Sequence, residues 1–386
     1  MVFDTGIPKL DRLLNDAGES PLGEGANEPA VGIVHDLINR FDPKLARLRP
    51  LLPKSWKKAK AAPLPSADGY PVYAAKTAAL VGAFQKLGGL PVTGKVDHAT
   101  ISALRTAQET KVLITPAELI FTHGLKYTHF LKAIVLTGGR ECRFDFTVMN
   151  RNSDRAGLSL GVLHWAQRPK RLAELIEFLR RRSPVWLNTN FVDLIFGGKS
   201  DMDRVIAHLR LGAAGLDKKG WSKNPDLEFA QPPMAVAKYW PACFETLVGT
   251  PFAQAAMVEM AIKTFRKLYD DSYADYPGDE TNLVGRDLKV YAPKLKSERA
   301  VIFALDMINQ HGGHVPTYYK NFDTGHPDAT EQQILESLRK QAADFWLGQT
   351  DYSPEVRAKN AAADTGRRNF FLQTKNLSSD VDFDPT

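Results

Sequence analysis

Two acidic side chains, Glu141 and Asp154, stand thirteen positions apart, the second of them within a polar Asn/Ser/Arg turn. Glu141 has the apolar neighbours Phe144 and Phe146, and burial beside them is expected to raise its pKa and keep it protonated. The polar surroundings of Asp154 are expected to keep that carboxyl group ionised. One protonated and one ionised carboxyl group predict glycoside hydrolysis, in which the acid protonates the leaving oxygen and the second carboxylate activates water.

A helix and a β-hairpin are the elements that must position these two acids. Apolar residues between 125 and 135 recur with helical spacing, and the Thr-Gly-Gly sequence at 137–139 is expected to close that helix. Glu141 is therefore expected just past the helix C-terminus. Residues 144–148 and 158–165 have strand character and are joined by the polar turn.

The residues after Asp154 follow a distinctive spacing. Gly157 stands three positions later, Ser159 five and Gly161 seven, and two aliphatic residues come next. This segment resembles the chitosanase branch of the lysozyme superfamily, whose catalytic Asp precedes a Gly, a water-positioning Thr and a second Gly at these spacings. The resemblance implies that Glu141 is the acid, Asp154 the base and Ser159 the residue that holds the attacking water.

The same hairpin is also similar to the Gly-rich second strand of lytic transglycosylases and phage lysozymes, through the sequence GLSLGVLHW at 157–165. The resemblance covers residues 125–168 and departs from chitosanases in a shorter spacing between the two acids. Chitosanases bind a polycation in an acidic cleft, whereas residues 111–386 are not acidic overall. These departures favour peptidoglycan over chitosan as the substrate.

Polar residues near the hairpin are candidates for hydrogen bonds to sugar hydroxyl or N-acetyl groups. They are Asn150, Asn152, His164 and Gln167, together with Gln310 on a later helix. A structural histidine is an equal alternative for His164, and a Gly312-capped helix end is the alternative at Gln310. His311 and His314 lack a third ligand, so no metal site and no cofactor are expected.

A second region, residues 68–108, contains two turns that each lead into a helix with a Thr in its first turn. Together with the segment before it, over roughly residues 26–108, it resembles the peptidoglycan-binding domain type 1 family through eight positions: Gly69, Thr77, Phe84, Gln85, Leu90, Gly94, Val96 and Thr100. The resemblance implies a small three-helix domain that contacts the cell wall through Thr77, Phe84 and Thr100. A domain that only tethers or packs is the alternative.

Length, composition and charge limit the number of domains and the class of partner. The 386 residues allow two or three domains, and 44% hydrophobic with 24% charged residues is ordinary for a globular protein. The net charge of +6 suits an anionic polymer such as a cell wall or a nucleic acid. Residues 26–109 carry twelve Lys or Arg against six Asp or Glu, either a binding patch or a solvated linker. No apolar run approaches the ~20 residues that span a bilayer.

The sequence therefore predicts a mainly α protein in three parts. These are a flexible arm at 1–25, a peptidoglycan-binding domain with an inserted loop at 26–110, and a lysozyme-like α+β catalytic domain at 111–386 with a short β-hairpin at its cleft. Besides the amphipathic run KRLAELIEFLRRR, later helices are expected at 201–211, 234–248, 252–269, 297–310 and 329–346.

The expected activity is hydrolysis of the peptidoglycan glycan strand between N-acetylmuramic acid and N-acetylglucosamine. The alternatives are a lytic transglycosylase, in which Glu141 alone acts as acid and then base, a chitosanase, and a non-enzymatic wall-binding or injected structural protein. Peptidoglycan is the expected partner, with no nucleic acid and no integral membrane segment, and the protein is expected to be a monomer. The N-terminus lacks a Sec signal, so delivery to the wall is expected by lysis or an injection system.

Overall fold

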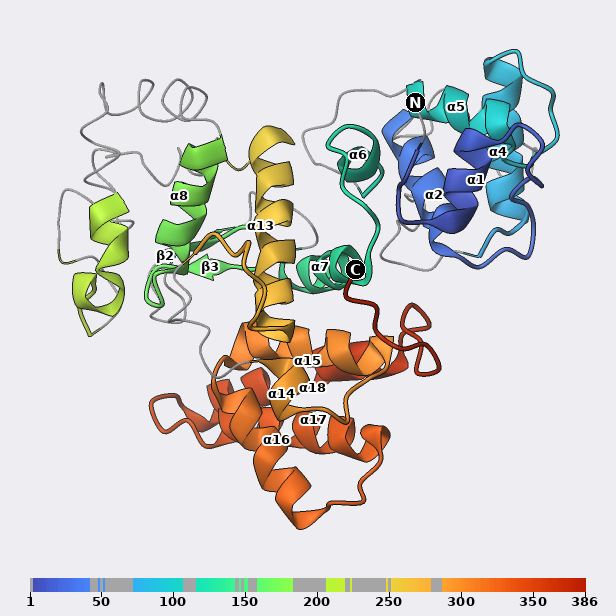
Figure 1. Cartoon of the computed structure of the whole chain (residues 1–386). Coiled ribbons are helices and arrows are strands. Elements are labelled where there is room, and N and C mark those ends of the chain that lie inside the picture. Colours follow the sequence, from blue (N-terminus) through green and yellow to red (C-terminus); the bar gives the residue numbers. More distant parts are fainter. Residues whose placement is uncertain are drawn as a thin grey trace. The chain divides into compact units, whose positions relative to one another are not determined.

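The computed structural model divides into two compact units, Met1–Thr128 and His129–Thr386. It describes residues 3–41, 48, 51–52, 72–106, 116–142, 146, 149–151, 158–182, 206–218, 223, 248, 251–278 and 287–386. The described chain is mainly helical with one small sheet (Figure 1). None of its helices is long and apolar enough to cross a membrane.

Unit 1 is a set of short helices in which α2 contacts three of the others. The helices are α1 (Pro8–Asn15), α2 (Pro29–Phe41), α4 (Ala75–Leu87), α5 (His98–Thr106) and α6 (Pro116–Phe121). The helices predicted on either side of the turn at Gly94 are thus present as α4 and α5. An antiparallel bridge between Leu22 and Val96 ties the N-terminal segment to the turn that precedes α5.

The N-terminal segment differs from the expected flexible arm. Helix α1 begins at Pro8 and buries Leu10, Leu13 and Leu14. These leucines follow helical i, i+3, i+4 spacing, and their burial fixes a segment whose composition is otherwise polar and Gly-rich. At the other end, unit 1 continues past the expected limit at 110, because α6 packs against α2.

Unit 2 combines long helices with a three-stranded antiparallel sheet in the order β1-β2-β3. Its elements are α7 (His129–Cys142), β1 (Met149–Arg151), β2 (Leu158–Leu160), β3 (Trp165–Ala166), α8 (Arg171–Arg182), the 3-10 turn η4 (Gly212–Gly215), α13 (Pro251–Tyr269), α14 (Leu288–Tyr291), α15 (Glu298–His311), α16 (His314–Gly325), α17 (Glu331–Leu347) and α18 (Pro354–Gln373). Helix α13 contacts both α7 and α8 (Figure 1).

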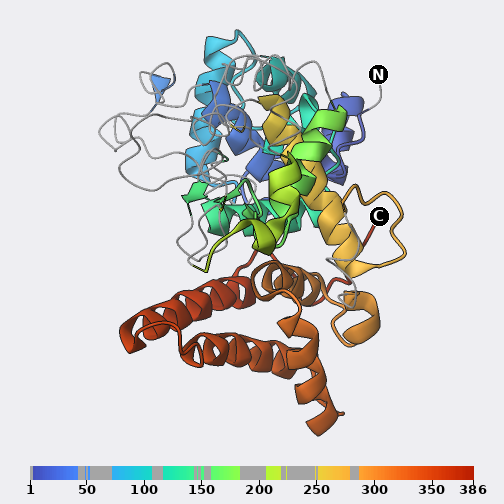
Figure 2. The ribbon, with the colours of Figure 1, turned by 90° about the vertical axis from the view of Figure 1, so that its left-hand side faces the viewer.

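Helix α15 is the most buried helix of this unit and contacts α7, α13, α16, α17 and α18. Helices α17 and α18 lie side by side along their length (Figure 2). Each starts at a hydroxyl cap, because the side chains of Thr330 and Ser353 accept hydrogen bonds from backbone N–H groups of the first turn. The close α17–α18 pair places the last turns of α18 against α15.

Most of the predicted helices of unit 2 are confirmed. The segments 252–269, 297–310 and 329–346 correspond to α13, α15 and α17, and the amphipathic KRLAELIEFLRRR run is α8. Residues 206–210 of the predicted 201–211 helix are helical. The predicted helix at 234–248 lies outside the described residues except for its last position.

The hairpin region differs from the prediction in two respects. The predicted second strand, 158–165, is divided into β2 and β3 by a turn, in which Gly161 has φ of 81° and His164 has φ of 48°. The first strand is seen at Met149–Arg151, later than the predicted 144–148, of which only Phe146 is described. A Gly at the start of the turn permits a left-handed backbone that other residues adopt at a cost.

Helix α7 also continues past the predicted Thr-Gly-Gly stop and ends at Cys142. Gly within a helix costs about 1 kcal/mol relative to Ala, which is less than the packing of a buried helix contributes. Here α7 packs on α13 and α15. Glu141 therefore lies in the last turn of α7 and has its orientation set by the helix.

Candidate functional site

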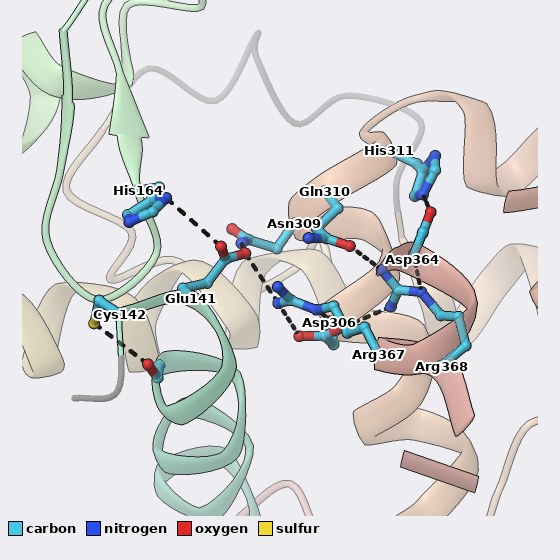
Figure 3. A network of polar contacts seen from close by, with 11 residues as sticks. Glu141, Cys142, His164, Asp306, Asn309, Gln310, His311, Asp364, Arg367 and Arg368 are labelled. Carbon is cyan, nitrogen blue, oxygen red and sulfur yellow. Dashed lines mark hydrogen bonds and ion pairs between the residues drawn. The ribbon is translucent and has the colours of Figure 1, made fainter. Parts of the chain in front are cut away.

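Glu141 is surrounded by nitrogen atoms from three different elements. Its Oε1 lies 2.9 Å from Nη2 of Arg367 on α18 and accepts a 3.4 Å hydrogen bond from Nδ2 of Asn309 on α15. Its Oε2 lies 3.6 Å from Nδ1 of His164 in the β2–β3 turn. Figure 3 shows the carboxyl group between His164 and Arg367. With 12% of its side chain exposed, Glu141 is buried enough for these contacts to be strong yet open to a ligand.

A buried ion-pair network stands behind Glu141. Arg367 donates through Nε and Nη2 to both oxygens of Asp306, at 2.8 and 2.5 Å, and Arg368 donates to Asp306 Oδ2 at 2.6 Å. Burial alone would raise the pKa of Asp306, but the two guanidinium charges outweigh it and lower that pKa below its ordinary value. The carboxylates of Asp306 and Glu141 in turn raise the pKa of Arg367 against the effect of burial. Arg367 is thus a fixed cation beside Glu141.

The network extends along α18 to Asp364. Asp364 Oδ1 accepts from Arg368 Nε at 2.8 Å, and Oδ2 pairs with His311 Nε2 at 2.6 Å (Figure 3). Burial would raise the pKa of Asp364, but the His311 hydrogen bond and the Arg368 charge lower it to about 2. Arg368 also donates to Gln310 Oε1, which leaves the amide nitrogen of Gln310 as the group available to a ligand.

A cavity of about 750 Å³ lies in front of this network. Its lining includes Glu141, Ser159, His164 and Gln310. The Ser159 hydroxyl and His164 Nε2 are buried and have no hydrogen-bond partner among the described residues. Buried polar atoms are rarely left without a partner, and unsatisfied ones concentrate where a ligand or water is bound. His164 also holds a positive φ, a strained conformation that is frequent at functional sites.

The structure brings four of the predicted site residues together at this cavity and leaves out others. Gln167 is 0% exposed and does not line the cavity, so it does not reach a ligand there. Asp154 and Asn152 lie outside the described residues. The backbone of Asn150 pairs with Ser159 across β1 and β2, and its side chain is not among those described.

Arg367, Asn309 and Asp364 were not predicted from the sequence as site residues. Asp306 and Gln310 lie four positions apart on α15, and both side chains contact Arg368 in the network. The available signal was the adjacent pair Arg367-Arg368 on a helix that must pack, because buried arginines need carboxylate partners. Asp364 lies four positions before Arg368 on the same helix, but no local spacing identifies the distant partners Asp306 and Glu141.

The three residues predicted to contact the wall are buried in unit 1. Thr77 hydrogen-bonds to His35 Nε2 at 2.9 Å, Thr100 accepts from Gln85 Nε2 at 2.9 Å, and Phe84 packs edge-on against Phe41 at 5.1 Å. Gln85 Oε1 also accepts from the backbone N–H groups of the turn at 93–94. The prediction of direct wall contact by Thr77, Phe84 and Thr100 is therefore corrected: these residues hold the domain together.

Unit 1 has an open groove of about 580 Å³ on its surface. Its lining includes Lys9, Glu24, Glu28, Thr93 and Lys95. The N-terminal segment supplies Lys9 and Glu24, Glu28 lies directly before α2, and the turn before α5 supplies Thr93 and Lys95. The groove therefore depends on the ordered N-terminal segment.

A family model described as a putative peptidoglycan binding domain matches residues 64–104. This match supports a peptidoglycan-binding domain in unit 1 and peptidoglycan as a partner. Neither the curated proteins nor the solved structures contain a match to the chain. Among the described residues, no group of three or more His, Cys, Asp or Glu side chains is arranged to hold a metal ion.

Proposed function

We propose that the protein is a peptidoglycan hydrolase of the lysozyme type, which cleaves the glycan strand between N-acetylmuramic acid and N-acetylglucosamine. The observation that supports this most is the position of Glu141, a carboxyl group at the wall of a 750 Å³ cavity that Ser159 also lines with a hydroxyl that has no partner among the described residues. Glu141 protonates the leaving oxygen, and Ser159 holds the water that attacks the opposite face of the sugar. Asp154 is the proposed base.

The contacts of Glu141 would stabilise the carboxylate that remains after the proton has been donated. A neutral carboxylic acid can donate to the glycosidic oxygen, and the carboxylate left afterwards is stabilised by Arg367 at 2.9 Å and by the amide of Asn309. His164 on the other side restricts the direction in which the acid points. Unit 1 would hold the enzyme on the wall and raise the local substrate concentration.

A lytic transglycosylase is the second candidate, because Glu141 is the only carboxyl group among the described residues that line the cavity. In that reaction Glu141 acts first as acid and then as base, and the sugar's own hydroxyl attacks to form a 1,6-anhydro product. The two reactions use the same bond and differ in the end group of the product.

Mass spectrometry of muropeptides released from purified sacculi tests the proposal. A hydrolase releases reducing ends, a transglycosylase releases anhydro ends, and a wall-binding protein without activity releases neither. Glu141→Gln keeps the size of the side chain but cannot donate a proton, so it should retain less than about a tenth of wild-type lysis. Glu336→Gln, at a 45% exposed position on α17 outside the cavity, is the matched control and should lyse normally.

We also propose that the protein reaches the wall from the cytoplasm by cell lysis or through an injection system. Secretion of the intact chain through the Sec pathway of a host cell, without a fused leader, would argue against it.

A further inference from the structure

One end of the cavity that contains Glu141 is lined by aromatic rings. His314, Phe345 and Trp346 all belong to its lining, and they come from the start of α16 and the end of α17. His314 is exposed, and Phe345 and Trp346 are each partly exposed. Their rings contact each other, with centroids 5.0 Å apart for His314 and Phe345 and 5.5 Å apart for Phe345 and Trp346. We name these three residues the aromatic platform.

Asp364 fixes the platform from behind. The same Oδ2 atom that pairs with His311 Nε2 also accepts a 3.2 Å hydrogen bond from Trp346 Nε1. Asp364 is itself held by Arg368, a member of the network behind Glu141. The ring of Trp346 therefore has a set orientation, and the platform and Glu141 share one rigid support.

His311 adds a polar atom beside the platform. Its ring packs on Phe345 at 5.3 Å, and its Nε2 is occupied by Asp364. Its Nδ1 is buried and has no partner among the described residues. His311 also lines the cavity. A small shift of the ring would bring Nδ1 to a ligand group in contact with the platform.

We propose that the aromatic platform is a subsite for a 2-acetamido sugar of the glycan strand. The apolar C–H face of the sugar ring stacks on Trp346. Phe345, whose ring stands at 77° to that of Trp346, contacts the edge of the sugar, and His311 Nδ1 bonds the acetamido group. Amphipathic aromatic rings suit such a ligand, since sugars present one apolar face and a polar rim. Because a deacetylated sugar lacks the acetamido group that His311 Nδ1 would bond, the platform favours an acetylated sugar over a deacetylated one.

This inference rests on the proposed function only for the identity of the ligand. Binding is measured in the Glu141→Gln background, by isothermal titration with the hexamer of N-acetylglucosamine and with the deacetylated hexamer as comparator. Trp346→Ala should weaken binding of the acetylated hexamer about tenfold. Trp346→Phe keeps the stacking surface without the bond to Asp364 and should recover part of that loss. Phe322→Ala, a partly exposed aromatic on α16 outside the cavity, should bind normally.

The outcomes separate the two proposals. If the wild-type protein hydrolyses sacculi but Trp346→Ala and Phe345→Ala both bind the hexamer with unchanged affinity, the sugar subsite is rejected and the proposed enzyme activity is kept. If binding depends on Trp346 but the wild-type protein releases no muropeptides, the sugar subsite is supported and the proposed hydrolase activity is rejected. Absence of binding by the acetylated hexamer, or equal affinity for the deacetylated one, would also overturn the platform. Circular dichroism of each variant distinguishes lost contact from lost folding.

Discussion

The Nη2 atom of Arg367 lies 2.9 Å from Oε1 of Glu141 and 2.5 Å from Oδ1 of Asp306. One guanidinium group thus joins the last turn of α7 to the middle of α15 through α18. Because arginine presents its donors in a rigid fork, this joint fixes both carboxyl groups in space. The position of Glu141 in the cavity depends on it.

Replacing Arg367 by Lys should distinguish the contribution of its positive charge from that of its hydrogen-bond geometry. A lysine ammonium keeps the positive charge but cannot donate to Asp306 and Glu141 together with the fork geometry. We expect a loss of lysis of at least about tenfold and a loss of about 2 kcal/mol in the free energy of unfolding. Turbidity of a sacculus suspension and urea unfolding measure the two effects. Arg339→Lys, at a half-exposed pair with Glu336, is the control, and normal lysis by Arg367→Lys would contradict the proposed joint.

Ser159→Ala and Asp154→Asn should each slow turnover if Ser159 holds the water and Asp154 activates it. Asp154→Asn should be the more severe change, because the base is lost outright. The carboxyl groups of Glu141 and Asp154 would then stand ~6.5–9.5 Å apart and the product would be inverted. The anomer of the product, read by proton NMR at early times, checks the stereochemistry. Near-normal turnover of Asp154→Asn with anhydro products would instead favour the transglycosylase.

Gly161→Ala should disturb the turn that carries His164. Gly161 has φ of +81°, and a Cβ there would lie 2.9 Å from Met257 Sδ and from two ring carbons of Trp165. We expect a loss of about 1–3 kcal/mol in the free energy of unfolding together with reduced lysis. The control is Gly366→Ala in α18, where a Cβ meets nothing within 4 Å and the change should be neutral or stabilising. Equal stability of the two variants would refute this account of the turn.

Asp364→Asn should lower stability at neutral pH and not in strong acid. The native pKa of Asp364 is about 2 and the ordinary value is 3.8, so its ionised form stabilises the fold above about pH 4. That contribution, about 2 kcal/mol, is lost as the pH falls from about 4 to 2. Urea unfolding of wild type and variant across this range should show a difference that closes with acid. A difference in the free energy of unfolding that stays constant from pH 7 to pH 2 would show that ionisation of Asp364 does not stabilise the fold. The control Asp351→Asn, at an exposed position, should unfold like the wild type across this range.

Wall binding should depend on the groove of unit 1 rather than on the buried Thr77, Phe84 and Thr100. Glu141→Gln protein, which leaves the sacculi intact, should sediment with them at low salt. Binding through the exposed Lys95 should weaken at high salt, since exposed charges are screened beyond ~10 Å at 0.1 M. Lys95→Gln should weaken it at low salt, whereas Lys359→Gln in unit 2 should not. If neither high salt nor Lys95→Gln weakens binding, the wall-contacting surface lies elsewhere on the domain.

The sequence by itself predicted several helices and a peptidoglycan-binding domain, which suggests peptidoglycan as a partner. Helical spacing of apolar residues predicts α13, α15 and α17, and the turn at Gly94 with its Thr-led helix marks the peptidoglycan-binding domain that the family model matches. It also indicated Glu141, Ser159 and His164 as site residues, through a resemblance to lysozyme-superfamily hydrolases over a short stretch that comprises the end of α7 and the hairpin after it. Such features are local, and local propensity is sufficient to predict them.

Only the tertiary structure decided what surrounds those residues. Arg367, Asp306 and Asp364 come from helices that follow the hairpin by more than a hundred residues, and no local spacing predicts that Arg367 will meet Asp306 and Glu141. Burial likewise removed Gln167 and Thr77 from the candidate surfaces, because a residue's exposure depends on what packs over it. The same holds for the polar N-terminal segment: its three leucines are buried in a core that distant parts of the chain help to form, and this burial stabilises α1.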